Sequence, residues 1–397
     1  MKEVETSGYR WAILAGVILA FMGSYGFAFA VISPVLVPLA QAFNVNITTA
    51  ALISTTMFGG AAVMSIPSGL LVDAWGIRRA AILAQGLMLS GWVITYLSAS
   101  FPTILLGRVV IGSGGIMMSV SGAAALVQWF KPEVLMLPMG IWAAGLPFGI
   151  AWGEPLAGQV IASMGWRGAF LTGTIIAIIC LSVTTVIIKP GPLGPGGPTT
   201  AADTAEPRAG NVFKKVDVWK FNFALLFAFI PFVAVATYWV TWLMVSKAIT
   251  SLVMASTITG FLGVAGIFGA PVAGYIAAQT KRSKPVFVVP SIIFALSLLA
   301  FVYAHGLAQL IVLSLIIGAV SYMLAAMMFA IPPQLVSSKF TGTALGTAVT
   351  FFNLAGIIGP LVIGDAFSSS GTLIWPSFFM FVCLLVAAIL TQTMKIH

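Results

Sequence analysis

The sequence predicts an all-α membrane protein in which twelve transmembrane helices form two pseudo-symmetric six-helix bundles. Hydrophobic residues make up 60% of the chain and charged residues 7%, and the mean hydropathy is +1.10, which excludes a soluble globular domain. Apolar segments of about 20 residues, the length that a helix needs to cross a bilayer, recur along the chain. The two halves of the chain also echo each other.

The twelve expected spans cover residues 11–37, 47–72, 80–99, 102–129, 135–162, 168–188, 218–245, 251–279, 285–304, 307–335, 342–367 and 372–394. The stretch 189–217 is rich in proline and glycine and poor in hydrophobic residues, so we expect it to be a flexible linker. It divides the chain into an N-terminal six-helix bundle, residues 1–188, and a C-terminal six-helix bundle, residues 218–397.

The basic residues predict the orientation. Of the 18 lysines and arginines, only Arg167 and Lys247 fall in loops on one side, Arg108 falls within a span, and the others lie on the opposite side. Because basic loops remain in the cytoplasm, both termini and the linker are expected there. This distribution explains the net charge of +9 without a nucleic-acid partner. We expect a monomeric, multi-pass protein embedded in the lipid bilayer of a prokaryotic cytoplasmic membrane.

The echo between the halves is a set of glycines at a nearly constant offset of about 205 residues, as expected for a membrane protein built from two repeats. The matching pairs are Gly69 with Gly274, Gly112 with Gly318, Gly153 with Gly359, and Gly158 with Gly364.

The run from Gly69 to Arg79, GLLVDAWGIRR, follows the second span. We expect Gly69 to let two helices approach closely, Asp73 to end the span, and Gly76 to permit a tight reversal. A carboxylate at the C-terminal end of a helix opposes the helix dipole. Asp73 should therefore be compensated by Arg78, by Arg79, or by the N-terminus of a neighbouring helix.

This run resembles the signature loop of the major facilitator superfamily, G-x-L-a-D-r-x-G-r-r, although Ala74 stands where the family usually has arginine. The resemblance implies secondary transport by two six-helix bundles. It also implies that Gly69, Asp73, Gly76 and the two arginines form a conformational latch on the cytoplasmic side. The alternative is an ordinary positively charged turn.

The fourth span contains LLGRVVIGSGG, in which Arg108 precedes Gly112 and Gly114. This matches the family pattern R-x-x-x-G-x-g, with Ile111 in place of the usual glutamine. An arginine costs roughly 2.5 kcal/mol or more at the membrane centre, so Arg108 should face a polar interior. The resemblance implies a role in substrate binding or proton coupling. The alternative is an arginine that snorkels to the headgroups or ties down a backbone carbonyl.

Glu154 is the only carboxylate well inside a predicted span. It lies about nine residues, or roughly 13 Å, from the outer end of the fifth helix, and Arg108 lies at a similar depth. If the fourth and fifth helices are neighbours, the two side chains could pair, and a change in that pair could load or release a proton. Glu154 is therefore the predicted coupling site. A static ion pair is the alternative.

In the family, the first, fourth, seventh and tenth helices line a central cavity. The resemblance makes Tyr25, Tyr238 and Tyr322 cavity candidates, together with Trp239 and Trp242, for which helix packing or an interfacial belt is the alternative. Mid-span Asn353 needs a hydrogen-bond partner, either a neighbouring helix or a bound solute. We expect Asp365, at the end of the eleventh span, to be solvated.

Together these features predict a secondary active transporter, driven by the proton gradient, for a small organic or inorganic anion. The Gly-Trp-Arg triplet at residues 165–167 is also similar to bacterial permeases for cyanate, nitrate and oxalate/formate. No enzyme motif, metal site or cofactor site is expected. The alternatives are proton-coupled efflux of amphipathic drugs, which the spacing of glycines and prolines in the fifth span does not favour, and an uncoupled facilitator.

Overall fold

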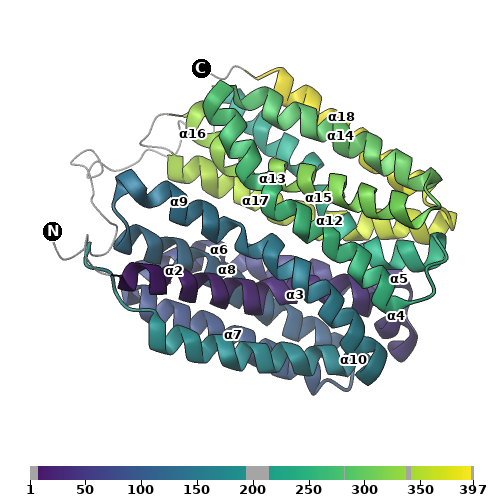
Figure 1. Ribbon diagram of the computed structural model, residues 1–397, viewed down its shortest axis with the longest axis horizontal. Coiled ribbons are helices and arrows are strands. Elements are labelled where there is room, and N and C mark those ends of the chain that lie inside the picture. Colours follow the sequence, from purple (N-terminus) through teal and green to yellow (C-terminus); the bar gives the residue numbers. More distant parts are fainter. Residues whose placement is uncertain (1–7, 194–213, 281, 337–340, 395–397) are drawn as a thin grey trace.

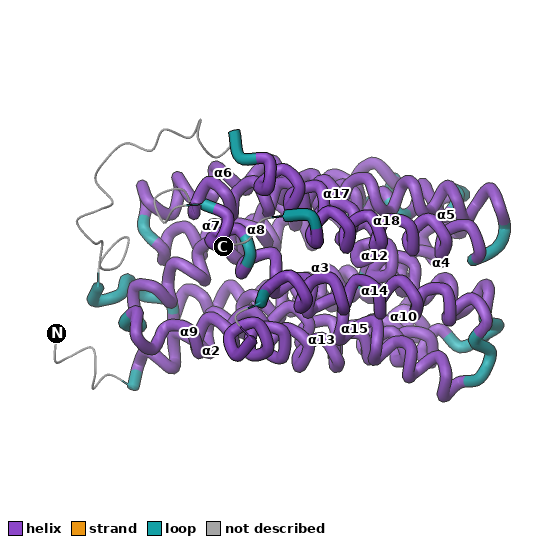
Figure 2. The backbone as a smooth tube through the Cα atoms, turned by 90° about the horizontal axis from the view of Figure 1, so that it is seen from above, coloured by secondary structure: helices purple, strands orange, loops and turns teal. Residues whose placement is uncertain are grey.

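The computed structural model describes residues 8–193, 214–280, 282–336 and 341–394. Every element in these ranges is a helix, and the helices run along the long axis of the molecule (Figures 1 and 2). Helices that precede the linker occupy one side of the molecule in Figure 1, and helices that follow it occupy the other. Most of the predicted linker, residues 194–213, lies outside the described residues.

The N-terminal half contains the first six spans. The first is built from α2 (Tyr9–Ala20), η1 (Phe21–Gly26), α3 (Phe27–Ala30) and α4 (Ile32–Phe43). The second is built from α5 (Ile47–Ala50) and α6 (Leu52–Trp75), and the third and fourth are α7 (Ile77–Tyr96) and α8 (Phe101–Trp129). The fifth and sixth are α9 (Pro132–Ala143) with α10 (Gly145–Ile187).

The C-terminal half repeats this plan. Its spans are α12 (Val216–Ser246), α13 (Leu252–Thr280), α14 (Ser283–Tyr303), α15 (Leu307–Ala330) with α16 (Pro332–Leu335), α17 (Thr341–Ser370) and α18 (Ile374–Gln392).

Two features of the N-terminal half explain why fewer than twelve segments meet the length and hydropathy expected of a membrane span. The described chain contains 10 segments that are long and apolar enough to cross a membrane. One of these segments, Leu137–Ile187, holds two spans, because Gly165 breaks α10 with φ 70° and ψ −177°. The third span, α7, has two arginines directly after its first residue, Ile77, and is therefore less apolar than the others. The predicted twelve-helix fold is confirmed.

The turns at helix ends follow local chemistry. Asn44 ends α4 in the left-handed conformation, with φ 51°. The side chain of Asn46 accepts a hydrogen bond from the backbone N–H of Thr49 at 2.6 Å and so caps α5, and Ser100 caps α8 in the same way through Thr103. Gly76 joins α6 to α7 with φ 79°, so the tight reversal expected there is present.

The internal repeat is visible in helix ends and in helix packing. Helices α6 and α13 end at Trp75 and Thr280, and α8 and α15 begin at Phe101 and Leu307, offsets of 205 and 206 residues. In the N-terminal half, a Cβ at Gly112 would collide with the carbonyl oxygen of Met57. In the C-terminal half, a Cβ at Gly318 would collide with the carbonyl oxygen of Leu262, which gives the same two offsets. The two bundles are therefore pseudo-symmetric at the level of individual contacts.

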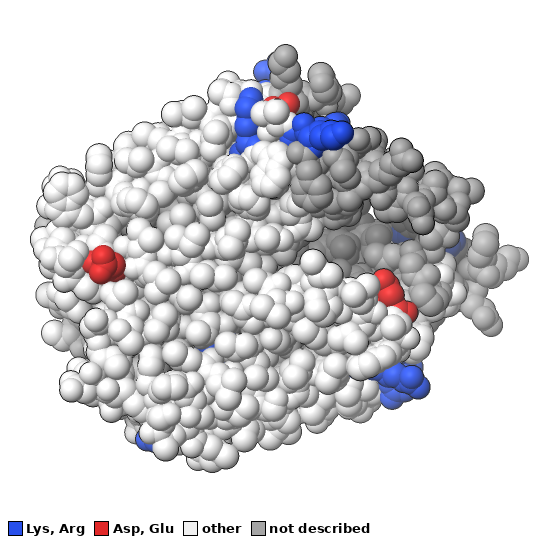
Figure 3. Space-filling view, turned by 180° about the vertical axis from the view of Figure 1, so that it is seen from behind, with Lys and Arg blue, Asp and Glu red and all other residues white. Residues whose placement is uncertain are grey.

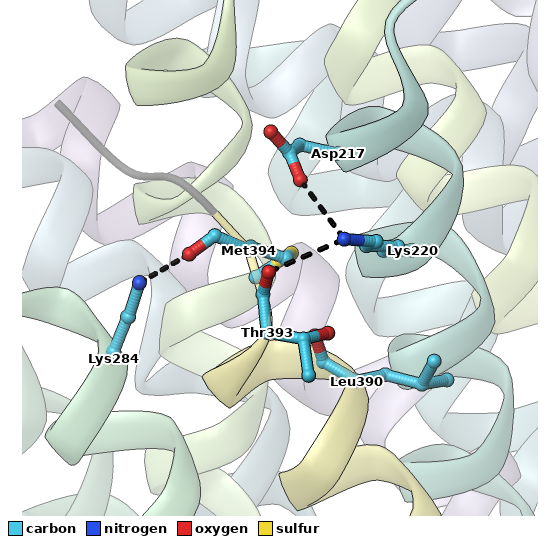
Figure 4. Close-up of polar contacts among 6 residues, drawn as sticks. All are labelled: Asp217, Lys220, Lys284, Leu390, Thr393 and Met394. Atoms are coloured by element: carbon cyan, nitrogen blue, oxygen red, sulfur yellow. Dashed lines mark hydrogen bonds and ion pairs between the residues drawn. The ribbon is translucent and has the colours of Figure 1, made fainter.

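The start of the first helix and the end of the last helix lie at one end of the molecule, which we call the terminal end. There the Tyr9 hydroxyl donates to the carbonyl of Ile187 at 2.8 Å. Figure 4 shows Lys220 and Lys284 donating to the carbonyl oxygens of Thr393 and Met394, so both lysines cap the C-terminus of α18. Between the ends, the broad face in Figure 3 shows almost no charged side chains, as expected for a surface in lipid.

Candidate functional site

The two halves are joined at the opposite end of the molecule, away from the terminal end. Four hydrogen bonds between described residues cross from one half to the other, and all of them involve serine or threonine hydroxyls. They are Thr48 with Ser368 (2.9 Å), Thr55 with the carbonyl of Ile357 (3.4 Å), Thr237 with Ser54 (3.1 Å), and the backbone N–H of Val240 with Ser33 (2.9 Å). We call these eight residues the hydroxyl seal.

Below the hydroxyl seal, apolar packing continues the contact. The ring of Phe58 lies 5.6 Å from that of Phe352, in an edge-to-face arrangement, and packs on Gly356. Gly263 of α13 packs against Pro147 and Ala151 of α10. Nearer the terminal end, the hydrogen bonds of Tyr9, Arg78 and Trp129 stay within the part of the chain that precedes α12. The described conformation is therefore closed at the sealed end.

A small cavity lies at this interface, with a volume of about 30 Å³. Glu154 of α10 lines it and is 2% exposed, and its Oε2 atom is buried with no hydrogen-bond partner. Across the cavity the C-terminal half contributes Tyr322 and Ser321 from α15. The remaining lining is apolar and comes from both halves: Phe29, Ile150, Phe232, Val235, Ala236, Leu262 and Phe294. A carboxylate thus stands at the boundary between the two bundles.

Arg108 is completely buried among the helices of the N-terminal half. Its Nη2 atom donates to the carbonyl of Ala28 at 2.8 Å and lies 3.0 Å from the sulfur of Met57, and its Nε donates to the carbonyl of Ile53 at 3.2 Å. Its Nη1 atom has no partner. Arg108 therefore ties α8 to α3 and α6 through backbone carbonyls, which is the alternative interpretation of the sequence.

The expected contact between Arg108 and Glu154 is absent from this conformation. Arg108 hydrogen-bonds to the first and second spans, whereas Glu154 faces the cavity and makes no ion pair among the described residues. The sequence placed both residues at similar depths but could not show that they point in different directions. Even so, they are the only buried charged side chains in the described part of the chain.

The three candidate tyrosines and Asn353 have separate positions. Tyr322 lines the cavity. Tyr238 does not line it, and its hydroxyl donates to the carbonyl of Pro360 at 2.6 Å while its ring stacks on Trp242. Tyr25 packs between Phe21 and Phe29, with the latter 5.1 Å away. Asn353 is buried in α17 outside the cavity lining, and its Nδ2 atom has no partner.

The two tryptophans and Asp365 follow the simpler interpretations. Trp239 donates from Nε1 to the hydroxyl of Ser314 at 3.0 Å, and its ring stacks on Phe301 at 4.1 Å. Trp242 packs beside it, at 6.1 Å. Both tryptophans are therefore packing residues. Asp365 is exposed, as expected.

The predicted latch loop is open in this conformation. Asp73 is exposed and forms no ion pair with Arg78 or Arg79, and Arg78 instead donates to the carbonyl of Thr185 at 3.1 Å. No atom lies within 4 Å of a Cβ built on Gly69, so the close helix approach expected there is not present. Gly112 and Gly114 do pack against neighbouring helices, since a Cβ at either would collide with a carbonyl oxygen, of Met57 or of Ala84.

The Gly-Trp-Arg triplet forms the turn between the fifth and sixth spans. Gly165 supplies the positive φ, and the Arg167 guanidinium lies 4.1 Å from the ring centre of Trp166 and donates to the carbonyl of Ser98 at 3.0 Å. These contacts account for the triplet by packing at the sealed end.

Sequence reasoning missed two groups of residues. The first is the hydroxyl seal, whose serines and threonines look like ordinary helix residues in the sequence. The second is a polar network at η1, a stretch of π-helix in the first span, where Ser24 and Gln85 both donate to the carbonyl of Ala20, at 2.8 and 3.1 Å. Within the described ranges, no group of three His, Cys, Asp or Glu side chains could hold a metal ion.

Comparisons with known proteins agree with this arrangement. A family model, Major Facilitator Superfamily, matches residues 13–360. The hexuronate transporter of Bacillus subtilis (strain 168) is 25% identical over 353 residues, which cover 83% of this chain and 81% of that protein. The probable L-galactonate transporter of Escherichia coli (strain K12) is 28% identical over 120 residues, 29% of this chain and 26% of that protein.

The fold has solved counterparts. A D-xylose–proton symporter superposes with a TM-score of 0.80 at 16% sequence identity, covering 97% of this chain and 98% of the symporter. The twelve-helix architecture, the internal repeat and the family model together lead to one assignment: this multi-pass integral membrane protein is a transporter that belongs to the Major Facilitator Superfamily.

Proposed function

We propose that this protein is a proton-coupled symporter of a small organic anion, with sugar acids as the substrate class. The observation that carries the proposal is Glu154, a buried carboxylate without a partner at a cavity between the two halves. The similarity to a hexuronate transporter over most of both chains supports the substrate class. A buried carboxylate that binds a proton removes its own desolvation cost, so proton binding and burial are coupled.

The mechanism that we propose is alternating access by two rigid halves, residues 1–188 and 218–397, joined by the linker. The basic residues support placing the terminal end in the cytoplasm of a prokaryotic cell. The described conformation would then face inward, with the hydroxyl seal closing the outer side. Opening outward would break the seal and close the latch around Asp73. The two halves contain all the parts of this cycle, so we propose a monomer.

Arg108 is proposed to serve this site indirectly. It holds α3 and α6 against α8, and α3 contributes Phe29 to the cavity. Its unpartnered Nη1 atom remains a donor for an anion in another conformation. We therefore propose distinct roles for the two buried charged residues: Glu154 carries the proton, and Arg108 shapes the cavity.

Proton flux in proteoliposomes tests the proposal. Vesicles that contain a pH-sensitive dye receive galacturonate, glucuronate, a neutral hexose or a lipophilic cation. We expect hexuronate to carry protons inward with it, and we expect the Glu154→Gln variant to lose that proton flux. The control is Asp365→Asn, which neutralises an exposed carboxylate far from the cavity and should behave like the unmodified protein.

Each other outcome identifies a different function. Proton movement opposite to a lipophilic cation would indicate drug efflux. Hexuronate uptake without proton movement in the unmodified protein would indicate an uncoupled facilitator. Proton flux that survives Glu154→Gln would exclude this carboxylate as the coupling site.

A further inference from the structure

Two buried polar atoms at the cavity lack hydrogen-bond partners. They are Oε2 of Glu154 and the hydroxyl oxygen of Tyr322. Buried tyrosine hydroxyls normally find a partner, and an unpaired buried polar group costs roughly 1–3 kcal/mol. Both residues line the same cavity, so a single bound molecule in that cavity would satisfy both atoms.

The two groups belong to different halves of the molecule. Glu154 lies on α10, and Tyr322 lies on α15. The ring of Tyr322 is fixed by an edge-to-face contact with Phe232, with centroids 5.4 Å apart, and by Gly266, where any side chain would collide with the ring. The hydroxyl is therefore presented to the cavity by a rigid support in the C-terminal half.

The cavity is of the right size for water. Its volume of about 30 Å³ exceeds the roughly 10–15 Å³ that one water molecule requires. A water at this position can hydrogen-bond to Glu154 and to Tyr322 at once. An ionised carboxylate only accepts hydrogen bonds, whereas a protonated carboxyl group also donates one, so the direction of the bridge depends on the proton.

No other charged group competes for this role in the cavity. The lining residues of α3, α12, α13 and α14 are all apolar, and the only other polar lining residue, Ser321, donates its hydroxyl to the carbonyl of Gly318 at 3.0 Å. Arg108, the one buried cation among the described residues, is bound to carbonyls of the first two spans and does not line the cavity.

We propose that Tyr322 transmits the protonation state of Glu154 to the C-terminal half, through a water held between the two side chains. Tyr322 is thus a positioning residue for proton coupling and not a proton carrier. This inference rests on the proposed function, because it assumes that Glu154 binds the transported proton.

A disulfide across the hydroxyl seal tests the inference without knowledge of the substrate. The hydroxyl oxygens of Thr48 and Ser368 are 2.9 Å apart, so the double variant Thr48→Cys/Ser368→Cys should crosslink when the outer side is closed. The two native cysteines, Cys180 and Cys383, are buried. Crosslinked fractions are measured in membranes between about pH 5.5 and 8.5, a range in which a buried carboxyl group changes its protonation state.

We expect the crosslinked fraction to change severalfold with pH in the double variant alone. It should become independent of pH when either Glu154→Gln or Tyr322→Phe is added. Tyr322→Phe keeps the ring contacts and removes only the hydroxyl. The control, Tyr303→Phe, removes a hydroxyl from an exposed tyrosine on α14 and should leave the pH dependence unchanged.

The outcomes separate the two proposals. If Glu154→Gln abolishes the pH dependence and Tyr322→Phe leaves it intact, the role of Tyr322 is refuted while proton binding at Glu154 stands. If both variants retain the pH dependence, or if the double variant shows none, both proposals fail.

Discussion

The two halves of this transporter share a backbone plan and differ in where they place charge. With the repeat offset of 206 residues, Arg108 in the N-terminal half corresponds to Ser314, and Glu154 corresponds to Pro360. Ser314 accepts a hydrogen bond from Trp239 at 3.0 Å, and the carbonyl of Pro360 accepts one from Tyr238 at 2.6 Å. At the two positions of the second half that are equivalent to the buried charges of the first half, neutral hydrogen bonds are therefore present.

This difference suggests how a duplicated fold divides its work. Buried charges are expensive in a membrane, so one half carries both of them and the other half does without. The neutral hydrogen bonds of the C-terminal half fasten α12 to α15 and α17. We expect the N-terminal half to respond to protons and anions, and the C-terminal half to act as the stable body against which it moves.

Truncating the two equivalent side chains should give the largest contrast. Arg108→Ala removes a fully buried side chain and three contacts, and should lower the free energy of unfolding by about 3 kcal/mol. Ser314→Ala leaves one indole N–H unpaired and should cost about 1 kcal/mol. Unfolding of each variant in mixed micelles, followed by tryptophan fluorescence, measures both values. Equal losses would show that the asymmetry in charge has no counterpart in stability.

The same experiment can separate the volume of Arg108 from its hydrogen bonds. Arg108→Met restores most of the buried volume without any donor. A stability close to that of the unmodified protein would assign the loss in Arg108→Ala to packing.

Adding one methyl group at equivalent glycines should instead make the halves look alike. Gly112→Ala and Gly318→Ala each push a Cβ into a backbone carbonyl, and each should lower the free energy of unfolding by about 2 kcal/mol. Gly69→Ala, at a helical position with free space, should be neutral or up to about 1 kcal/mol more stable. Thermal unfolding of the purified variants ranks the three. Tolerance of alanine at only one of the first two positions would break the equivalence of the repeats.

The smallest expected effect lies at the sealed end. Lys247 follows α12, donates to the carbonyl of Val302 at 2.7 Å and lies 5.1 Å from the ring centre of Phe301. Burial lowers the pKa of this ammonium below its ordinary 10.5. Its equivalent in the first half is Gln41, which does not titrate.

Because the folded state then releases this proton before the unfolded state does, stability should rise as pH increases toward 10.5. The rise should be no more than about 0.5 kcal/mol, since solvent screens this partly exposed group. Denaturation midpoints at a series of alkaline pH values, for the unmodified protein and Lys247→Met, measure the slope. A slope that persists in Lys247→Met would assign the effect to another group.

The sequence predicted the features that depend on hydrophobicity and on reversals of the chain. Span positions follow from the length of apolar runs, and the reversal at Gly76 follows from the only residue type that adopts positive φ at low cost. The repeat could be read from glycines such as Gly112 and Gly318, because only glycine permits those backbone contacts. Burial of Glu154 followed from its depth in a span.

Side-chain direction and conformational state were beyond the sequence. In an almost uniformly apolar helix, hydrophobic periodicity does not reveal that the side chain of Arg108 points toward α3 and α6. The role assigned to Gly69 presumes a state in which the terminal end is closed, and a sequence encodes both states of a transporter at once. The hydroxyl of Tyr238 donates to the carbonyl of Pro360, which lies 122 residues away in the chain, so the sequence around Tyr238 does not indicate this contact.

The chemistry of the hydroxyl seal determines how the protein responds to the salt concentration of the medium. Its four hydrogen bonds involve no ionised side chain, so dissolved ions cannot screen them as they screen exposed ion pairs. The sealed end should therefore keep its strength at low and at high ionic strength. If Glu154 binds the transported proton as proposed, the response of the protein to the medium then resides at that carboxylate and not at the seal.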